Sequence, residues 1–210
     1  MLDAPARRLL DHPLSGVARF IDRPLVSPNR LTLIGLATGL GSAAAAAGQW
    51  WWWALALWLF SRLMDGLDGP LARRRRADGR AASPGSESGG FLDITADFFV
   101  YGATVVGVAV GATRQYDADW LPFVLVLLAY YVNGTAFLAF SSIAERTGRQ
   151  REDGRSLSFL GGLAEGTETI AVHSVWLLLP AHAGTIATVW AAVVGLSAAQ
   201  RIVAGFRDLS

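Results

Sequence analysis

Long apolar stretches joined by polar connections constrain this chain more than any other feature of its sequence. A membrane-spanning helix needs about twenty mostly apolar residues. Six stretches approach that length, at roughly residues 31–48, 49–66, 91–112, 119–142, 166–181 and 184–204. The composition agrees, since 52% of the 210 residues are hydrophobic and 17% are charged, against about a quarter charged in an average soluble domain. The sequence therefore predicts an all-α, polytopic membrane protein with six transmembrane helices.

The stretches follow one another closely enough to predict a single domain over residues 1–210, with a six-helix transmembrane bundle over 31–205. Residues 1–30 predict an amphipathic helix that lies in the membrane surface. Asp11 is placed to cap this helix, and Pro13 to stand in its first turn. The apolar face of the helix consists of Leu14, Val17, Phe20 and Ile21. The alternative is a helix that packs against the rest of the protein as part of a soluble cap.

The distribution of arginine predicts the orientation in the membrane. With the N-terminus in the cytoplasm, seventeen of the eighteen arginines fall on the cytoplasmic side, and only Arg114 falls on the other. Such a bias is typical of cytoplasmic loops. Four tryptophans, 50–53, and Trp120 lie at the outer turns, as expected for indoles at a membrane surface. We therefore predict a cytoplasmic (inner) membrane protein with both termini inside. The run 74–76 predicts an anchor to anionic lipid headgroups.

Composition also excludes several kinds of site and partner. The chain has no Cys and three scattered His, which excludes thiol nucleophiles and thiolate metal sites and disfavours zinc. The net charge is +1, so no overall positive field indicates nucleic acid binding.

Four aspartates form the most informative pattern. Asp65 and Asp68 are three residues apart at the end of the second stretch, and Asp93 and Asp97 are four apart at the start of the third. Each pair shares a helix face, and consecutive antiparallel helices bring both pairs to a similar depth. Two carboxylates about 4 Å apart repel by about 4 kcal/mol at an effective dielectric constant of about 20. The cluster therefore predicts bound hard cations, Mg²⁺, Mn²⁺ or Ca²⁺, and two such ions could clamp a diphosphate.

The residues around the aspartates fit a phosphate ligand. Gly69, Gly89 and Gly90 allow a close approach of backbone or ligand, and Arg73 is placed to pair with phosphate oxygens. The alternative, carboxylates that only cap helix ends or face headgroup water, explains two facing pairs poorly. We therefore expect the active site at the cytoplasmic ends of these helices.

This pattern resembles the CDP-alcohol phosphotransferase family, whose motif has the form D-x2-D-G-x2-A-R, a spacer, and G-x3-D-x3-D. The segment 28–32 also resembles the family's entry into its first span. The spacer, residues 74–88, is longer than is usual, and we expect its polar surplus to extend into the cytoplasm without moving the helices. Every fixed position of the motif is filled, by Asp65, Asp68, Gly69, Ala72, Arg73, Gly89, Asp93 and Asp97.

The resemblance implies a reaction in phospholipid biosynthesis. A CDP-linked donor, CDP-diacylglycerol or a related lipid, gives its substituted phosphate group to a small alcohol, and CMP leaves. It also implies a homodimer and two Mg²⁺ or Mn²⁺ ions on Asp65, Asp68, Asp93 and Asp97. Asp97 would in addition be the base for the acceptor hydroxyl. The residues that the resemblance places at the nucleotide and diphosphate are Asn29, Gly69, Ala72, Arg73 and Gly89.

A second group of polar residues is a candidate acceptor pocket. Glu165 and Glu168 lie three apart at the start of the fifth stretch, and the loop before them carries Arg149, Arg151 and Arg155. A carboxylate within a span indicates function by default, and the arginines could hold a phosphate on the acceptor. The equally weighted alternative is that these residues only form ion pairs with one another.

Two other functions remain open at this point. An aspartate-rich membrane prenyltransferase also clamps a diphosphate with Mg²⁺, but Ala72, Arg73 and Gly89 do not belong to that pattern. A small cation transporter would carry its carboxylates near the middle of the bilayer rather than at one end. Separately, Gly35 and Gly39 in the first stretch predict close helix packing.

Overall fold

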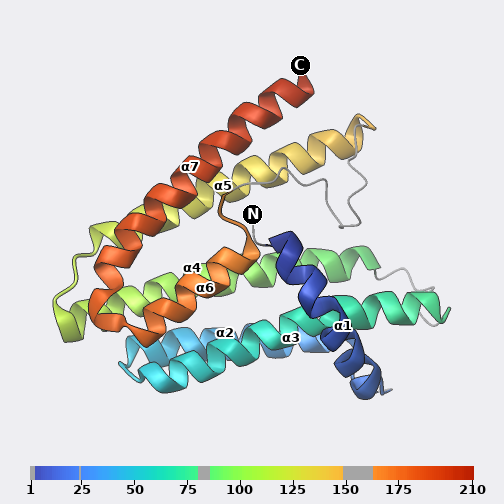
Figure 1. Ribbon diagram of the computed structural model, residues 1–210, viewed down its shortest axis with the longest axis horizontal. Helices are drawn as coiled ribbons and strands as arrows, with labels where there is room; N and C mark the ends of the chain where they lie inside the picture. Colours follow the sequence, from blue (N-terminus) through green and yellow to red (C-terminus); the bar gives the residue numbers. More distant parts are fainter. Residues whose placement is uncertain (1–2, 24, 80–85, 149–162) are drawn as a thin grey trace.

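The computed structural model describes residues 3–23, 25–79, 86–148 and 163–210, and these ranges contain helices and no strands. The predicted all-α fold is confirmed (Figure 1). The elements are α1 (Asp3–Ile21), α2 (Pro28–Ala47), α3 (Trp51–Ala77), α4 (Ser86–Tyr116), α5 (Leu121–Arg146), α6 (Gly166–Leu178), the 3-10 turn η1 (Pro180–His182) and α7 (Ala183–Leu209).

Helices occupy all six predicted stretches, but their lengths and polarity differ. Among the described residues, four helices are long and apolar enough to cross a membrane: α2, α4, α5 and α7. Helix α3 has 27 residues but carries a buried arginine, two aspartates and a basic last turn. Helix α6 has 13 residues, about 20 Å at 1.5 Å per residue, whereas the hydrocarbon core is about 30 Å thick. The structure therefore supports a membrane protein with four clear candidate spans.

The helices form two groups that cross each other (Figure 1). Helices α2, α3 and α4 lie side by side, and α2 packs extensively against both of the others. Helices α5 and α7 form a second pair. Helix α6 lies between the groups and contacts α3, α4 and α7. The core between them is built on large side chains with almost no exposure, among them Trp58, Val100, Phe123, Trp176 and Val194.

Close packing of α2 depends on its glycines, as predicted. A Cβ atom added at Gly39 would lie 2.6 Å from Val100 Cγ1 of α4 and 2.9 Å from Ser61 Oγ of α3. At Gly35 the nearest atom would be the Ser61 carbonyl oxygen, 3.3 Å away. These two positions let α2 approach both neighbours, which brings the ends of α3 and α4 together.

Helix α1 crosses α3 and packs against it. Leu14, Ala18 and Ile21 pack against a small cluster around Leu67 and Leu71 of α3. Two of the predicted apolar-face residues instead stay exposed, since Val17 is 43% and Phe20 is 77% accessible. The helix thus shows both a packed side and an apolar exposed side.

One sequence prediction about this region is wrong, and another is incomplete. The helix begins at Asp3 and contains Pro13, so Asp11 does not cap it, because the first turn lies further upstream than the proline suggested. The arginine run is not only a lipid anchor. Arg74 Nε donates to Asp22 Oδ2 at 3.2 Å, and Arg75 Nε donates to Asp22 Oδ1 at 3.0 Å, which ties the end of α1 to the end of α3.

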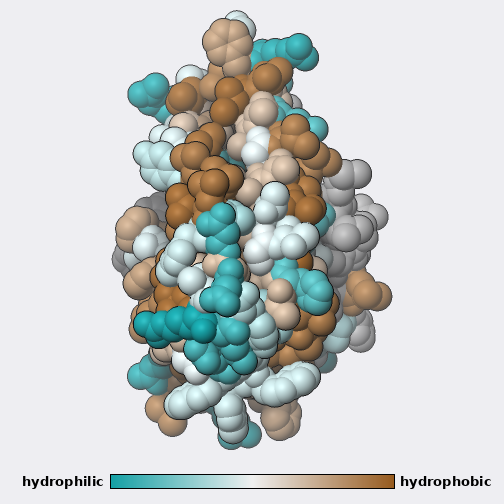
Figure 2. All heavy atoms as spheres, turned by 90° about the vertical axis from the view of Figure 1, so that its left-hand side faces the viewer, coloured by the Kyte–Doolittle hydropathy of each residue, from teal (hydrophilic) through white to brown (hydrophobic). Residues whose placement is uncertain are grey.

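The end of the bundle opposite α1 is polar at its tip and apolar on its flanks (Figure 2). The α2–α3, α4–α5 and α6–α7 connections meet at this end. The connections and the helix ends beside them carry exposed polar and tryptophan side chains, namely Gln49, Arg114, Asp117, Asp119, Trp50, Trp52 and Trp120. A polar tip ringed by tryptophan is the surface expected where a bundle leaves the bilayer.

Candidate metal and phosphate centre

Three of the four predicted carboxylates converge where α3 and α4 run side by side. One oxygen from each of Asp65, Asp68 and Asp93 lies within 4.8 Å of the others. Hydropathy placed the end of the second stretch at residue 66, but α3 continues to Ala77 with Pro70 inside it. The whole motif from Asp65 to Arg73 is therefore helical, which gives its side chains the i, i+3 and i, i+4 spacing.

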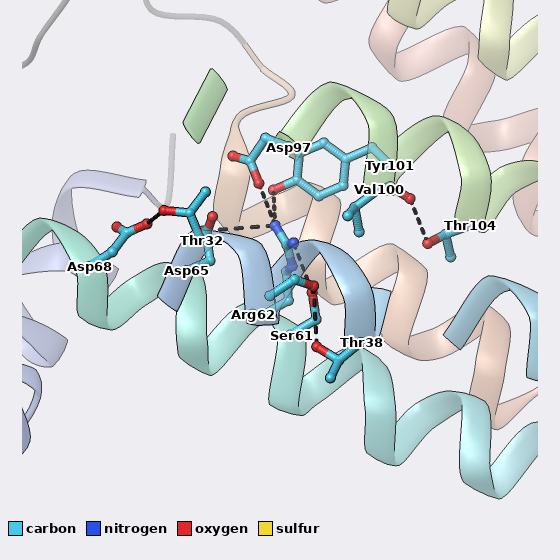
Figure 3. Close-up of polar contacts among 11 residues, drawn as sticks. Thr32, Thr38, Ser61, Arg62, Asp65, Asp68, Asp97, Val100, Tyr101 and Thr104 are labelled. Carbon is cyan, nitrogen blue, oxygen red and sulfur yellow. Dashed lines mark hydrogen bonds and ion pairs between the residues drawn. The ribbon is translucent and has the colours of Figure 1, made fainter. Parts of the chain in front are cut away.

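Asp97 joins the centre through Arg62 (Figure 3). Arg62 Nη1 donates to Asp97 Oδ1 at 2.6 Å and lies 3.8 Å from Asp65 Oδ2. From the sequence alone Arg62 was one of the seventeen arginines predicted to be cytoplasmic, and its contact with Asp97 was not predicted. Its place three residues before Asp65 was an available signal, because charges within a span pair with one another.

The Arg62 side chain is buried and contacts Trp58, Tyr101 and Ser61. It is only 6% exposed, and Cζ lies 5.1 Å from the ring centroids of both Trp58 and Tyr101, a distance that gives cation–π contact. Its Nη2 donates to Ser61 Oγ at 3.0 Å. The guanidinium is thus a fixed positive charge between the two acidic helices.

Thr32 of α2 is a second residue that the sequence analysis did not place in the site. Its Oγ1 donates to Asp68 Oδ2 at 2.6 Å, and both residues are buried. Ser27 caps α2 by accepting from the Arg30 backbone N–H at 3.3 Å. This cap fixes where α2 begins, and so places Thr32 one turn inside it, opposite Asp68.

The residues predicted to contact the nucleotide and diphosphate lie close to the carboxylates. A Cβ atom at Gly89 would be 3.1 Å from Asn29 Oδ1, so the starts of α2 and α4 meet here. A Cβ atom at Gly69 would be 3.4 Å from Arg73 Nη1, so this guanidinium lies over the glycine. Ala72 is half-buried and Arg73 is exposed. The structure therefore gathers small residues and one accessible arginine beside the carboxylates.

A cavity of about 380 Å³ opens beside Asp97, between α4, α5, the start of α6 and α7. Its polar lining includes Asp97, Tyr130, Asn133, Glu165 and Arg201. Glu165 was predicted for the acceptor pocket, whereas Arg201, buried on α7, was counted only as a cytoplasmic arginine. A cavity of this size fits a small ligand.

The cavity wall is stiffened by a buried hydrogen-bond chain. Trp190 Nε1 donates to Tyr130 Oη at 2.7 Å, and Tyr130 Oη lies 2.9 Å from His173 Nε2. His173 is fully buried and stacks between Trp58 and Trp176, with ring centroids 4.9 and 4.8 Å away. The imidazole therefore links the cavity to the aromatic cage around Arg62.

A comparison with known families decides the class of this protein. The family described as CDP-alcohol phosphatidyltransferase matches residues 25–198. The chain belongs to this family. As a CDP-alcohol phosphatidyltransferase it is a membrane transferase of phospholipid biosynthesis, which moves a substituted phosphate group from a CDP-linked donor to an alcohol. The prenyltransferase and cation-transporter alternatives are thereby set aside.

Individual relatives agree with the family. The chain is 34% identical to the inner membrane protein YnjF of Escherichia coli (strain K12), over 100% of this chain and 97% of the relative. It is 30% identical to an archaetidylinositol phosphate synthase of Pyrococcus horikoshii, over 67% of this chain and 73% of that protein.

Solved structures share the fold. The crystal structure of Mycobacterium tuberculosis phosphatidylinositol phosphate synthase (PgsA1) with CDP-DAG bound matches with a TM-score of 0.70 at 20% identity, covering 92% of this chain and 93% of that chain. A structure of PgsA1 in complex with manganese and citrate matches with a TM-score of 0.67 at 20% identity, covering 92% and 88%.

In the part of the chain that the structure describes, the other residues predicted for the acceptor pocket of this phosphatidyltransferase are not found in the lining of the cavity. Glu168, on the first turn of α6, is half-buried and is not among the described residues that line the cavity. Arg149, Arg151 and Arg155 lie outside the described residues, as do residues 80–85 of the lengthened spacer.

Proposed function

We propose that the protein transfers a phosphatidyl group from CDP-diacylglycerol to a small polar alcohol at the carboxylate centre between α3 and α4. The observation that supports this most directly is the meeting of Asp65, Asp68 and Asp93 beside a cavity that Asp97 lines. The donor's diphosphate would lie on the carboxylate side, and the acceptor in the cavity. Relatives named for inositol phosphate lipids make inositol phosphate the first acceptor to test.

The donor set fits a hard divalent cation. Three carboxylate oxygens within 4.8 Å of one another can close around an ion with ligand distances of about 2.0–2.2 Å after a small side-chain adjustment. We propose Mg²⁺ or Mn²⁺ at Asp65, Asp68 and Asp93, which when bound neutralises charge on the diphosphate. The number of ions depends on Asp97, which already contacts Arg62.

The protein's own groups then position the reaction. Arg73, with Gly69, Ala72, Gly89 and Asn29 around it, would hold the nucleotide and its phosphates. Asp97 would accept the proton of the acceptor hydroxyl. The acceptor oxygen forms a bond to the donor phosphorus that carries the lipid, the bond from that phosphorus to the CMP oxygen breaks, and CMP leaves. Phosphoryl transfer of this kind needs positioning and charge neutralisation rather than a covalent nucleophile.

Release of CMP tests this proposal. Purified protein in detergent with CDP-diacylglycerol, an alcohol panel and Mn²⁺ should release CMP, and EDTA should abolish the release. Asp93→Asn should lower the rate at least a hundredfold while the thermal unfolding profile stays cooperative. Asp119→Asn changes an exposed carboxylate at the opposite end and should keep full activity. Unchanged CMP release by Asp93→Asn would contradict the assigned role.

We also infer the placement of the protein in the membrane. The single domain over 1–210 would cross the cytoplasmic membrane six times within 31–205, with α1 lying on the inner surface. The exposed apolar side of α1 and the tryptophans at the opposite end support this placement. Both termini and the carboxylate centre would then be cytoplasmic. Two copies would assemble as a homodimer, and a molar mass of two chains in detergent, from multi-angle light scattering, would support this.

A further inference from the structure

Arg62 carries a feature of the carboxylate centre that the family motif does not contain. Its Nη1 is 2.6 Å from Asp97 Oδ1 and 3.8 Å from Asp65 Oδ2 (Figure 3). One positive atom is therefore shared between a carboxylate of α3 and a carboxylate of α4. A metal ion that bridges two carboxylates occupies a position of this kind.

The carboxylates are accordingly not equivalent. Asp65, Asp68 and Asp93 have oxygens within 4.8 Å of one another, and among the described residues Asp97 does not belong to that group. Asp97 instead forms an ion pair, in which its Oδ1 accepts a hydrogen bond from Arg62 Nη1. Three carboxylates face a common point, and the fourth faces a guanidinium.

Arg62 cannot easily leave this position. Its guanidinium is stacked between Trp58 and Tyr101, and Nη2 is bound by Ser61. An arginine stays protonated in proteins, and a buried charge that loses its partner is strongly unfavourable. The positive charge of Arg62 is therefore a built-in part of the centre.

Two-ion phosphate sites hold their ions about 3.5–4 Å apart. A second ion bound by both Asp65 and Asp97 would have to occupy the position of Arg62 Nη1. The positive charge of Arg62 would also repel it. We propose that Arg62 takes the place of the second divalent ion in this protein, so that one ion binds to Asp65, Asp68 and Asp93. This inference rests on the proposed metal centre, and it revises the sequence-based expectation of two ions.

Binding of Mn²⁺ alone tests the inference without reference to activity. Protein in detergent is titrated with Mn²⁺ and followed by electron paramagnetic resonance. We expect one tightly bound ion per chain and a six-line mononuclear spectrum for the unaltered protein. Arg62→Gln should bind a second ion and show the broadening that two nearby Mn²⁺ ions produce, whereas Arg62→Lys should still bind one. Arg114→Gln removes an exposed arginine at the other end and should also bind one.

A second variant keeps the inference testable if Arg62→Gln does not fold. Asp97→Asn should bind one Mn²⁺ with a Kd within threefold of the unaltered protein, because Asp97 is not a ligand. Asp93→Asn should lose binding at least tenfold. Two coupled ions in the unaltered protein, or a tenfold loss of affinity in Asp97→Asn, would overturn the role of Arg62 and leave the metal centre intact. The absence of any Mn²⁺ binding would overturn the metal centre and this inference together.

Discussion

The hydroxyl of Thr32 holds one carboxylate of the proposed metal centre from a third helix. Because its bond to Asp68 Oδ2 is short and buried, it fixes the rotamer of a ligand before any ion arrives. Hydrogen bonds to charged groups contribute about 1.5–3 kcal/mol. Thr32→Val keeps the shape of the side chain and removes that bond.

We expect Thr32→Val to raise the Kd for Mn²⁺ about tenfold, which corresponds to about 1.4 kcal/mol. Isothermal titration in detergent measures it. Thr38→Val is the matched control, since the Thr38 hydroxyl bonds only to the backbone of its own helix. Equal affinities in the two variants would show that Asp68 needs no support from α2.

The Tyr130 hydroxyl on α5 links α5 to His173 on α6 and to Trp190 on α7. Tyr130→Phe would leave Trp190 Nε1 and His173 Nε2 buried without this partner, and each such loss costs about 1–3 kcal/mol. We expect a lower free energy of unfolding by about 2 kcal/mol, measured by denaturant unfolding in detergent. Tyr131→Phe, at a neighbouring residue that is 72% exposed, should leave the stability unchanged; an equal loss in both variants would contradict the structural role.

At this scale the sequence predicted what lies close along the chain. Asp65 and Asp68, or Asp93 and Asp97, are related by helical spacing, so their shared faces followed from the residue numbers. The contact of Arg62 with Asp97 joins residues on different helices, and the packing of α3 and α4 against α2 brings them together. Counting arginines to predict orientation also did not distinguish the buried Arg62 and Arg201 from the other arginines.

Among the elements, α2 acts as the spacer that sets how closely α3 and α4 approach. We expect Gly39→Ala to destabilise the protein by about 1–3 kcal/mol, the usual cost of an overpacked core, because the new Cβ would meet Val100 and Ser61. Thermal unfolding in detergent measures the loss. Gly41→Ala, on the same helix, meets only Leu57 Cδ1 at an ordinary 3.6 Å and should be neutral or slightly stabilising, because Ala favours the helix more than Gly does. A comparable fall in stability there would contradict the assignment of the Gly39→Ala effect to its contacts with Val100 and Ser61.

The ends of the elements were predicted less well than their existence. Hydropathy marks where a helix leaves the apolar phase, but backbone hydrogen bonding continues beyond that point. Helix α3 therefore extends to Ala77 through Pro70, and α4 begins at Ser86. Helix α6 ends at Leu178, where η1 follows with Pro180 as its first residue, although the apolar sequence runs on to residue 181.

For the whole molecule, the absence of Cys from the sequence makes the orientation directly measurable. Single cysteines at Asp119 and Ser210, both exposed, lie at the two ends of the bundle. We expect Asp119→Cys to react with a membrane-impermeant maleimide in right-side-out vesicles. Ser210→Cys should react only in inverted vesicles. The reverse pattern would place the carboxylate centre outside and contradict the proposed placement.

The arrangement of the bundle was only partly predictable. The apolar stretches identified six helices, and the carboxylate spacing correctly predicted that acidic side chains of α3 and α4 meet. The pairing of α5 with α7 was not predicted, since an apolar stretch shows that a helix is buried or faces lipid but not which helix it packs against. The cavity beside Asp97 draws its lining from four elements, so no local pattern could reveal it.

Helix α3 carries both the outer tryptophans and the carboxylates without a break. Trp52 and Asp65 are separated by thirteen residues, about 20 Å along the axis. In the proposed placement, the length of this segment of α3 would set the distance between the headgroups at the tryptophan end and the reacting phosphate at the carboxylate end. In a thicker or thinner bilayer, the helices would have to change their tilt. The turnover rate would then depend on the length of the lipid acyl chains.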